Sequence, residues 1–91
     1  MSIARLNKDV KVRIKKVLAK RLPPGVKVED IKDDTPLIEL GVGVDSLATL
    51  ELIVALEQEF QVRLNEEEIN IEVLENIESI TNYITKRVVS F

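Results

Sequence analysis

The chain has 91 residues, 45% hydrophobic and 32% charged, which is enough for one small folded domain and too apolar for a disordered chain. It contains no cysteine and no histidine, which excludes disulfides, thiolate and imidazole catalysis and nearly all zinc sites. Up to Lys27 the chain has nine basic residues and one acidic residue, a net charge of +8; the rest has four basic and fifteen acidic residues, a net charge of −11. The overall charge of −3 therefore conceals a basic first part and an acidic second part. Without a membrane-length apolar run or a signal sequence, we expect a single cytoplasmic domain over residues 1–91.

The first stretch, from about Ile3 to Leu22, has apolar residues at helical spacing and basic residues at most other positions. Pro23-Pro24-Gly25 is expected to end this helix. The basic residues are typical of a solvated outer face. Nucleic-acid or membrane-surface binding is the weaker alternative, because no aromatic or glycine-rich element accompanies the charge.

A long connection, residues 26–44, follows the first helix, and connections of this length are often functional. Residues 28–31 are expected to form one helical turn. Several apolar residues predict that the connection is pinned across the bundle: Val26, Val28, Ile31, Leu37, Ile38 and Leu40.

A glycine-punctuated run from Leu40 to Leu47 leads into a central helix, which the apolar spacing predicts over residues 47–60. Asp45 is the expected N-cap, which makes Ser46 the first helical residue and turns its hydroxyl toward water. The amides and the dipole of a helix N-terminus favour an anion, so a phosphoryl group on Ser46 would lie in a favourable place.

Two asparagines mark further helix starts. Asn65, followed by three glutamates, predicts a short helix that carries Ile69, and Asn76 predicts a last helix through about Val88. No alternating β pattern competes. The expected fold class is all-α: a four-helix bundle with three longer helices, one short helix and a long loop between the first and second.

The central helix has more apolar surface than one core contact needs. One sector forms the expected core face: Thr49, Leu52, Ile53, Leu56 and Phe60. A neighbouring sector holds Leu47, Leu50 and Val54, with Glu51 at its border and Glu57 near the direction of Ser46. An apolar stripe with charged edges predicts a docking surface, unless the long loop covers Leu47 and Leu50.

Catalysis by the chain itself is not expected. No histidine, cysteine or nearby lysine could activate Ser46, and Glu66-Glu67-Glu68 does not match a calcium loop. We therefore predict no catalytic residue and no metal site, and chemistry supplied by a cofactor or a partner.

The region from Leu37 to Ile84 resembles the acyl carrier proteins and their relatives, the peptidyl and aminoacyl carriers. The similarity is densest in one run: Leu40-Gly41, then Asp45-Ser46-Leu47-Ala48-Thr49-Leu50-Glu51-Leu52, then Ala55-Leu56-Glu57-Gln58-Glu59-Phe60. The glutamate triplet and Ile80-x-x-Tyr83-Ile84 extend it. Asp-Ser-Leu alone would be unspecific, but within this context the motif is strong.

The resemblance implies that a phosphopantetheinyl transferase attaches 4′-phosphopantetheine from coenzyme A to Ser46, and that the thiol of the arm carries acyl groups as thioesters. The carrier would pass them between enzymes of fatty-acid, lipid or polyketide-type synthesis, with shelter for the chain between the central and last helices. Basic patches on these enzymes would contact the central helix. The implied partner-binding residues are Asp45, Leu47, Leu50, Glu51, Val54 and Glu57.

Several features depart from the common family pattern. Val42-Gly43-Val44 lengthens the segment before Asp45 by two residues, Ala48 and Gln58 are neutral where many fatty-acid carriers hold acids, and residues 69–76 also run about two longer. With the basic first helix, these features suggest a specialised carrier. We also expect a freestanding carrier, since the chain starts at Met1 and shows no Ala/Pro linker at either end, and we expect a monomer. The alternatives are an aminoacyl or peptidyl carrier, which the acidic central helix disfavours, and a helical adaptor that binds partners without a prosthetic group.

Overall fold

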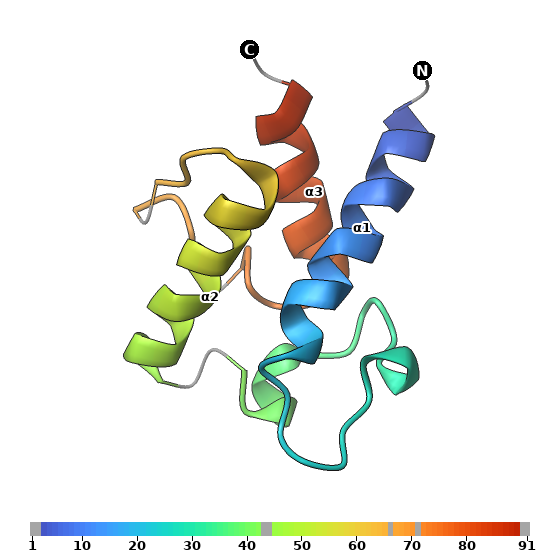
Figure 1. Ribbon diagram of the computed structural model, residues 1–91, viewed down its shortest axis with the longest axis vertical. Helices are drawn as coiled ribbons and strands as arrows, with labels where there is room; N and C mark the ends of the chain where they lie inside the picture. The colour runs from blue at the N-terminus through green and yellow to red at the C-terminus, as the bar shows by residue number, and fades with distance from the viewer. Residues whose placement is uncertain (1–2, 43–44, 66, 71, 90–91) are drawn as a thin grey trace.

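The computed structural model describes residues 3–42, 45–65, 67–70 and 72–89. Within these residues it contains the helices α1 (Ile3–Ala19), α2 (Ser46–Phe60) and α3 (Ile77–Val89) and no β-strand. Two short 3₁₀ turns, η1 (Val28–Asp30) and η2 (Leu37–Leu40), lie in the connection between α1 and α2 (Figure 1). The all-α class is therefore confirmed, as is the helical turn expected near residue 28.

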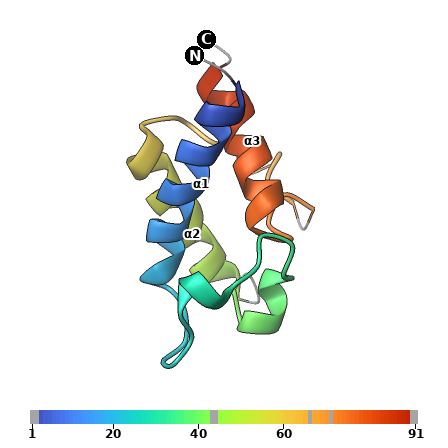
Figure 2. The ribbon, with the colours of Figure 1, turned by 90° about the vertical axis from the view of Figure 1, so that its right-hand side faces the viewer.

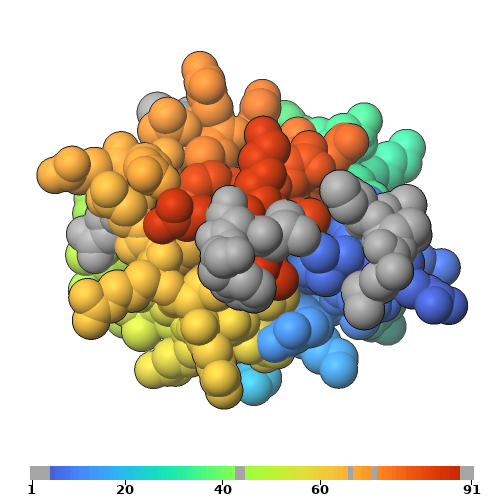
Figure 3. Space-filling view, turned by 90° about the horizontal axis from the view of Figure 1, so that it is seen from above, coloured from blue at the N-terminus to red at the C-terminus, as the bar shows by residue number. Residues whose placement is uncertain are grey.

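Helix α1 packs against both α2 and α3 and runs in the opposite direction to them (Figures 1 and 2). The start of α1 and the end of α3 lie together at one end of the bundle. Seen from that end, α1, α3 and the connection after α2 occupy separate sectors of the surface (Figure 3). The start of α2 lies at the opposite end, close to η2 (Figures 1 and 2).

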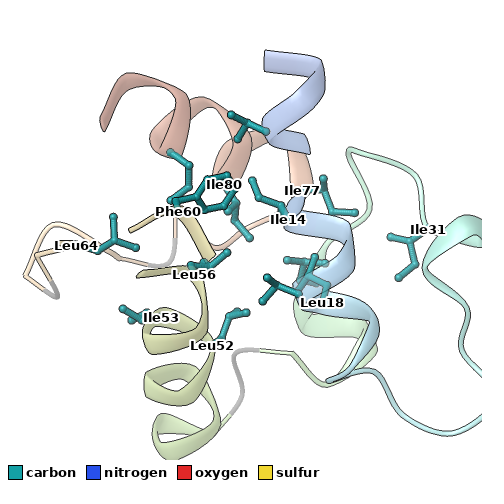
Figure 4. Close-up of a cluster of buried hydrophobic side chains, with 14 residues drawn as sticks. Ile14, Leu18, Ile31, Leu52, Ile53, Leu56, Phe60, Leu64, Ile77 and Ile80 are labelled. Atoms are coloured by element: carbon teal, nitrogen blue, oxygen red, sulfur yellow. The ribbon is translucent and has the colours of Figure 1, made fainter. Parts of the chain in front are cut away.

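The core is made of aliphatic side chains apart from Phe60, in line with the shortage of aromatics. Ile14 and Leu18 of α1 are fully buried and belong to the same cluster as the inward face of α2 and residues Ile77 and Ile80 of α3 (Figure 4). Of the five residues expected on the core face of α2, Thr49 is only half-buried and four are buried: Leu52, Ile53, Leu56 and Phe60. Packing of this kind, rather than helix propensity, stabilises short helices in water.

Helix α1 ends at Ala19, about three residues earlier than predicted. Proline at position 23 disfavours helical backbone at the residue before it. The Arg21 N–H already donates to the Leu18 carbonyl at 2.8 Å, a tight last turn, and Gly25 takes a φ of +89° that suits glycine.

Helix α3 begins with the cap predicted at Asn76. The Ser79 N–H donates to the Asn76 side-chain oxygen at 2.7 Å, and the Asn76 N–H donates to the Ser79 hydroxyl at 3.1 Å. This reciprocal arrangement satisfies two backbone donors at the helix start.

The short helix expected after Asn65 is wrong for the described residues, which form turns between Phe60 and Ile77; Glu66 and Ile71 lie outside them. Asn65 does accept from the Glu67 N–H at 3.0 Å, as a cap would. However, the side chain of Asn70 accepts from the Val73 N–H at 3.1 Å and so starts a second turn. Two asparagine-capped turns in succession replace one continuous helix.

The same connection is held to α3 by a small polar network. The Tyr83 hydroxyl donates to Glu68 Oε2 at 3.1 Å, and Arg87 pairs with the same carboxylate at 3.7 Å. Arg87 also donates to the Arg63 carbonyl at 3.1 Å. Burial, together with the hydrogen bond to Glu68, raises the pKa of Tyr83 above its ordinary value of 10.0.

The long connection between α1 and α2 is anchored at several points. Ile31 and Leu37 are buried, and the Leu37 N–H donates to the Glu75 carbonyl at 2.8 Å, so the expected pinning is confirmed at these residues. Ile38, expected to share this role, is instead 64% exposed. Consecutive residues of a tight 3₁₀ turn point in different directions, so Leu37 and Ile38 cannot both face the core.

Asp33 adds a charged anchor to the same connection. Its carboxylate pairs with Lys11 at 2.7 Å and with Lys15 at 3.4 Å. The hydrogen bond from Lys11 is the main reason that the pKa of Asp33 is lowered from 3.8, against an opposing contribution from burial.

We expect Asp33→Asn to lower the free energy of unfolding at neutral pH by about 1 kcal/mol or less, because the ion pairs are partly solvated. A lowered pKa in the folded chain means that Asp33 adds stability above pH 3.8 and loses this contribution as the pH falls through the folded-state pKa. Urea unfolding of both proteins at neutral pH and in strong acid measures this effect. The difference in the free energy of unfolding between the two proteins should disappear in strong acid. Asp34→Asn, at the exposed neighbouring position, serves as the control.

Candidate functional site

Ser46 is the first residue of α2 and is exposed. Asp45 before it has extended backbone, with φ −105° and ψ 129°, and its side chain accepts from the Leu47 N–H at 3.0 Å. The Asp45 carbonyl accepts from both the N–H and the hydroxyl of Thr49, each at 2.9 Å. The predicted N-cap is therefore confirmed, and it fixes the helix start at Ser46.

Replacing Asp45 by Ala is expected to lower the free energy of unfolding by about 0.5–2 kcal/mol, because the Leu47 amide loses its acceptor. Asp45→Asn should keep most of the stability, since the amide oxygen can accept the same bond. Chemical denaturation of the three proteins gives the comparison. Equal losses in both variants would mean that charge, rather than the hydrogen bond, stabilises this helix start.

The side chains beyond Ser46 on the outer face of α2 form an apolar stripe, defined by Leu47, Leu50 and Val54. They are 64%, 41% and 46% exposed, whereas the core face of the same helix is buried. The second apolar sector predicted from the sequence is thus confirmed, and the alternative that the long loop covers Leu47 and Leu50 is wrong. An exposed stripe of this kind on a small domain is typical of a contact surface.

The three acidic residues predicted beside the stripe have different surroundings. Asp45 serves as the helix cap. Glu57 is half-buried, and its carboxylate accepts from the Leu64 N–H at 2.9 Å. Glu51 is exposed, and it lines a hollow together with Arg21 of the α1–α2 connection.

The sequence could not show that Glu57 is used inside the fold. Gln61 has a left-handed backbone with φ 53°, which ends α2 and turns the chain back. The Val62 N–H then reaches the Glu57 carbonyl at 3.2 Å, and the Leu64 N–H reaches its side chain. Glu57 therefore holds the end of α2 to the following connection.

A mostly apolar hollow of about 460 Å³ lies beside the first turn of α2. Ile38 and Val42 line it from the η2 side, Thr49 from α2, and Ile69 and Leu74 from the connection after α2. Sequence reasoning missed this site because its walls come from three separate segments. Of the lining residues named here, the helical spacing of the central helix covered only Thr49, which it assigned to the core face.

The side chains that face the interior between α2 and α3, where the resemblance implied shelter for a bound chain, are shielded from solvent at the described residues. Ile77, Ile80 and Ile84 of α3 are at most 1% exposed, and Leu52 and Leu56 of α2 are 2% exposed. Open space near Ser46 lies instead toward η2 and the turns that follow Asn65.

Two kinds of feature are absent from the described residues. These residues hold no group of three or more acidic, histidine or cysteine side chains that could hold a metal ion. In that same part of the chain, no helix combines the length and the apolarity that crossing a membrane requires.

Ser46 fits the chemistry of a phosphodiester attachment. An exposed primary hydroxyl stands at the N-terminus of a capped, 15-residue helix, where the dipole favours negative charge. An apolar stripe and an apolar hollow flank it, so a partner surface and the stem of a flexible arm both have apolar area to contact.

Comparisons with known proteins agree with this geometry. The family model described as the phosphopantetheine attachment site matches residues 12–84, a region that includes Ser46 and all of α2. The chain is also similar to a carrier protein from Agrobacterium tumefaciens, solved in a complex with an engineered Bradyrhizobium japonicum glycine:[carrier protein] ligase and ATP. The two are 25% identical with a TM-score of 0.69, over 82% of this chain and 95% of that chain.

Domains of this family are not catalysts; they bear 4′-phosphopantetheine covalently and serve enzymes that act on the group it carries. The expectations of a carrier, of this cofactor and of a non-enzyme are therefore confirmed. The chain belongs to the family of carrier proteins with a phosphopantetheine attachment site.

Proposed function

We propose that the chain carries its cargo as a thioester on a 4′-phosphopantetheine arm attached to the hydroxyl of Ser46. The observation that supports this residue most strongly is its position: it is exposed at the start of α2, within the region that matches the family. The chain has no histidine, and the neighbouring Asp45 side chain already accepts from the Leu47 N–H, so we expect the transferase to supply the base that accepts the hydroxyl proton.

The residues around Ser46 have separate roles in this proposal. Asp45 fixes the helix start and, with Glu51, offers negative charge to basic partner patches. Leu47, Leu50 and Val54 supply the apolar contact. Glu57 acts by holding the end of α2 in place, because its carboxylate is bonded within the fold. The partners are a phosphopantetheinyl transferase and enzymes that load or modify the cargo.

The first candidate cargo is an acyl group on its way through fatty-acid, lipid or polyketide-type synthesis. The apolar hollow beside the first turn of α2 supports it, since an aliphatic chain could lie against Ile38, Val42 and Leu74.

We further propose that residues 1–91 act as one domain, as a monomer and in the cytoplasm. One continuous core joining all three helices supports the single domain.

An amino acid is the second candidate cargo. The similarity to a carrier protein solved with a glycine:[carrier protein] ligase favours it, as do the neutral residues Ala48 and Gln58 on α2. In this case an ATP-dependent ligase would form the thioester.

Mass analysis of the protein purified from its source tests both candidates. An arm that releases a fatty or polyketide-type acyl group under hydroxylamine supports the first, and an arm that releases an amino acid supports the second. A purified protein that carries no arm, and that does not acquire one from coenzyme A with a broad-specificity transferase, contradicts the carrier proposal and favours the noncovalent adaptor.

A further inference from the structure

A groove with a positively charged edge runs between α1 and α2. Its larger part, about 600 Å³, is lined by Lys16, Lys20 and Arg21 on one side and by Ala55 and Gln58 on the other. A smaller hollow of about 370 Å³ shares Arg21, Ala55 and Gln58 with it and extends to Leu50 and Val54. The groove therefore opens directly onto the apolar stripe.

Two sets of cations on α1 and directly after it differ in their partners. Lys11 and Lys15 pair with Asp33, and Arg13 pairs with Glu59 at 2.9 Å while lying 4.4 Å from the centre of the Phe60 ring. These contacts hold the fold together. Lys16 and Lys20, in contrast, are exposed and have no carboxylate within 4.0 Å in the described part of the chain.

Arg21 belongs with the second group. Its guanidinium donates to the Val17 carbonyl at 3.0 Å and forms no ion pair among the described residues, although Glu51 lines the same hollow. A guanidinium has five N–H donors, so this contact leaves most of them for a partner. Across the groove, the Glu59 carboxylate is already paired with Arg13.

We propose that this groove, together with Leu50 and Val54, receives an acidic amphipathic helix on the surface of a partner enzyme. Apolar side chains of that helix pack on Leu50, Val54 and the small floor residue Ala55. Its carboxylates contact Lys16, Lys20 and Arg21, none of which forms an ion pair within the described chain. Charge complementarity favours this occupant, because the groove carries three cations without an ion pair, against the single exposed carboxylate of Glu51 in the smaller hollow, while Glu59 is neutralised by Arg13.

The position of the groove suits a carrier, and to this extent the inference rests on the proposed function. Ala55 is nine residues from Ser46 on the same helix, roughly 14 Å at the helical rise per residue. A partner held in the groove therefore has its surface beside the end of α2 that bears Ser46. The basic α1, whose role the sequence left open, becomes one edge of the contact surface.

Two synthetic helical peptides test the proposal. They share the same leucine face and differ in the flanking positions, which are glutamate in one and lysine in the other. Fluorescence anisotropy gives the affinities, and amide chemical shifts locate the contact. We expect only the acidic peptide to bind, and we expect its binding to weaken at high salt. Binding should change the amide chemical shifts of residues 16–21 and 50–58.

Charge variants give the second arm of the test. K16E/K20E should weaken binding of the acidic peptide by about tenfold or more, and K16Q/K20Q should give a smaller loss. K8E/K86E makes the same change in net charge at exposed positions that do not line the groove, and it should bind as the wild type does. Urea unfolding verifies that each variant is folded.

No binding of the acidic peptide, equal binding of the basic peptide, shifts confined to other residues, or equal losses in K16E/K20E and K8E/K86E would each overturn the proposal. The assay uses the protein without its arm, so it does not depend on modification of Ser46. If the protein binds the acidic peptide but never accepts phosphopantetheine, the carrier function is refuted and the proposal for the groove is still supported. The reverse result would refute the groove alone.

Discussion

Ser46→Ala should abolish phosphopantetheine attachment, with no gain in intact mass after incubation with coenzyme A and a broad-specificity transferase. The reason is geometric. The nearest hydroxyl on the same helix, that of Thr49, is half-buried and donates to the Asp45 carbonyl at 2.9 Å, so it cannot take over as acceptor. The wild-type protein should gain the mass of one arm under the same conditions.

The fold of this variant should be unchanged, which makes the result interpretable. Ser46 is exposed, and removing an exposed hydroxyl outside a cap changes the free energy of unfolding by about 0.5 kcal/mol or less. Urea unfolding of both proteins verifies this. A mass gain in the folded Ser46→Ala protein would place the attachment elsewhere and contradict our assignment.

The second large effect is expected in the core. Ile14 of α1 is 0% exposed and lies where α2 and α3 both pack against it (Figure 4). Ile14→Ala should lower the free energy of unfolding by about 2–5 kcal/mol, because it removes buried methyl groups and leaves a cavity. Since domains of this size are stable by only about 5–15 kcal/mol, the variant should be partly unfolded at modest denaturant concentrations.

Val12→Ala is the matched control for this measurement. It lies on the same helix, is also β-branched and is 49% exposed, so the gain in helix propensity is similar but almost no cavity forms. Its free energy of unfolding should stay within about 0.5 kcal/mol of the wild type. Equal losses in the two variants would mean that α1 is not the packing centre of the bundle.

Local signals in the sequence predicted much of this molecule. The apolar spacing identified the core face and the exposed stripe of α2, and capping preferences placed the starts of α2 and α3 at Asp45 and Asn76. Such features depend on residues within one or two turns of each other. A reader of the sequence can therefore find them without knowing the tertiary structure.

The errors concern competition between neighbours and contacts between distant segments. Asn65 and Asn70 can each cap a turn with the side chain. The sequence does not reveal that two short capped turns are more stable here than one continuous helix. The use of Glu57 depends on the left-handed turn at Gln61. Likewise, the ion pairs of Asp33 with Lys11 and Lys15 depend on how the long connection folds back beside α1, which the sequence does not show.

The polar network between α3 and the preceding connection has a practical consequence. Tyr83 is the sole tyrosine of the chain, which has no tryptophan, so nearly all of its ultraviolet emission arises from this one phenol. The carboxylate that accepts its hydrogen bond belongs to Glu68, in the segment that departs most from the expected helix. The emission of Tyr83 should therefore report whether that segment is packed against α3, and no dye needs to be introduced.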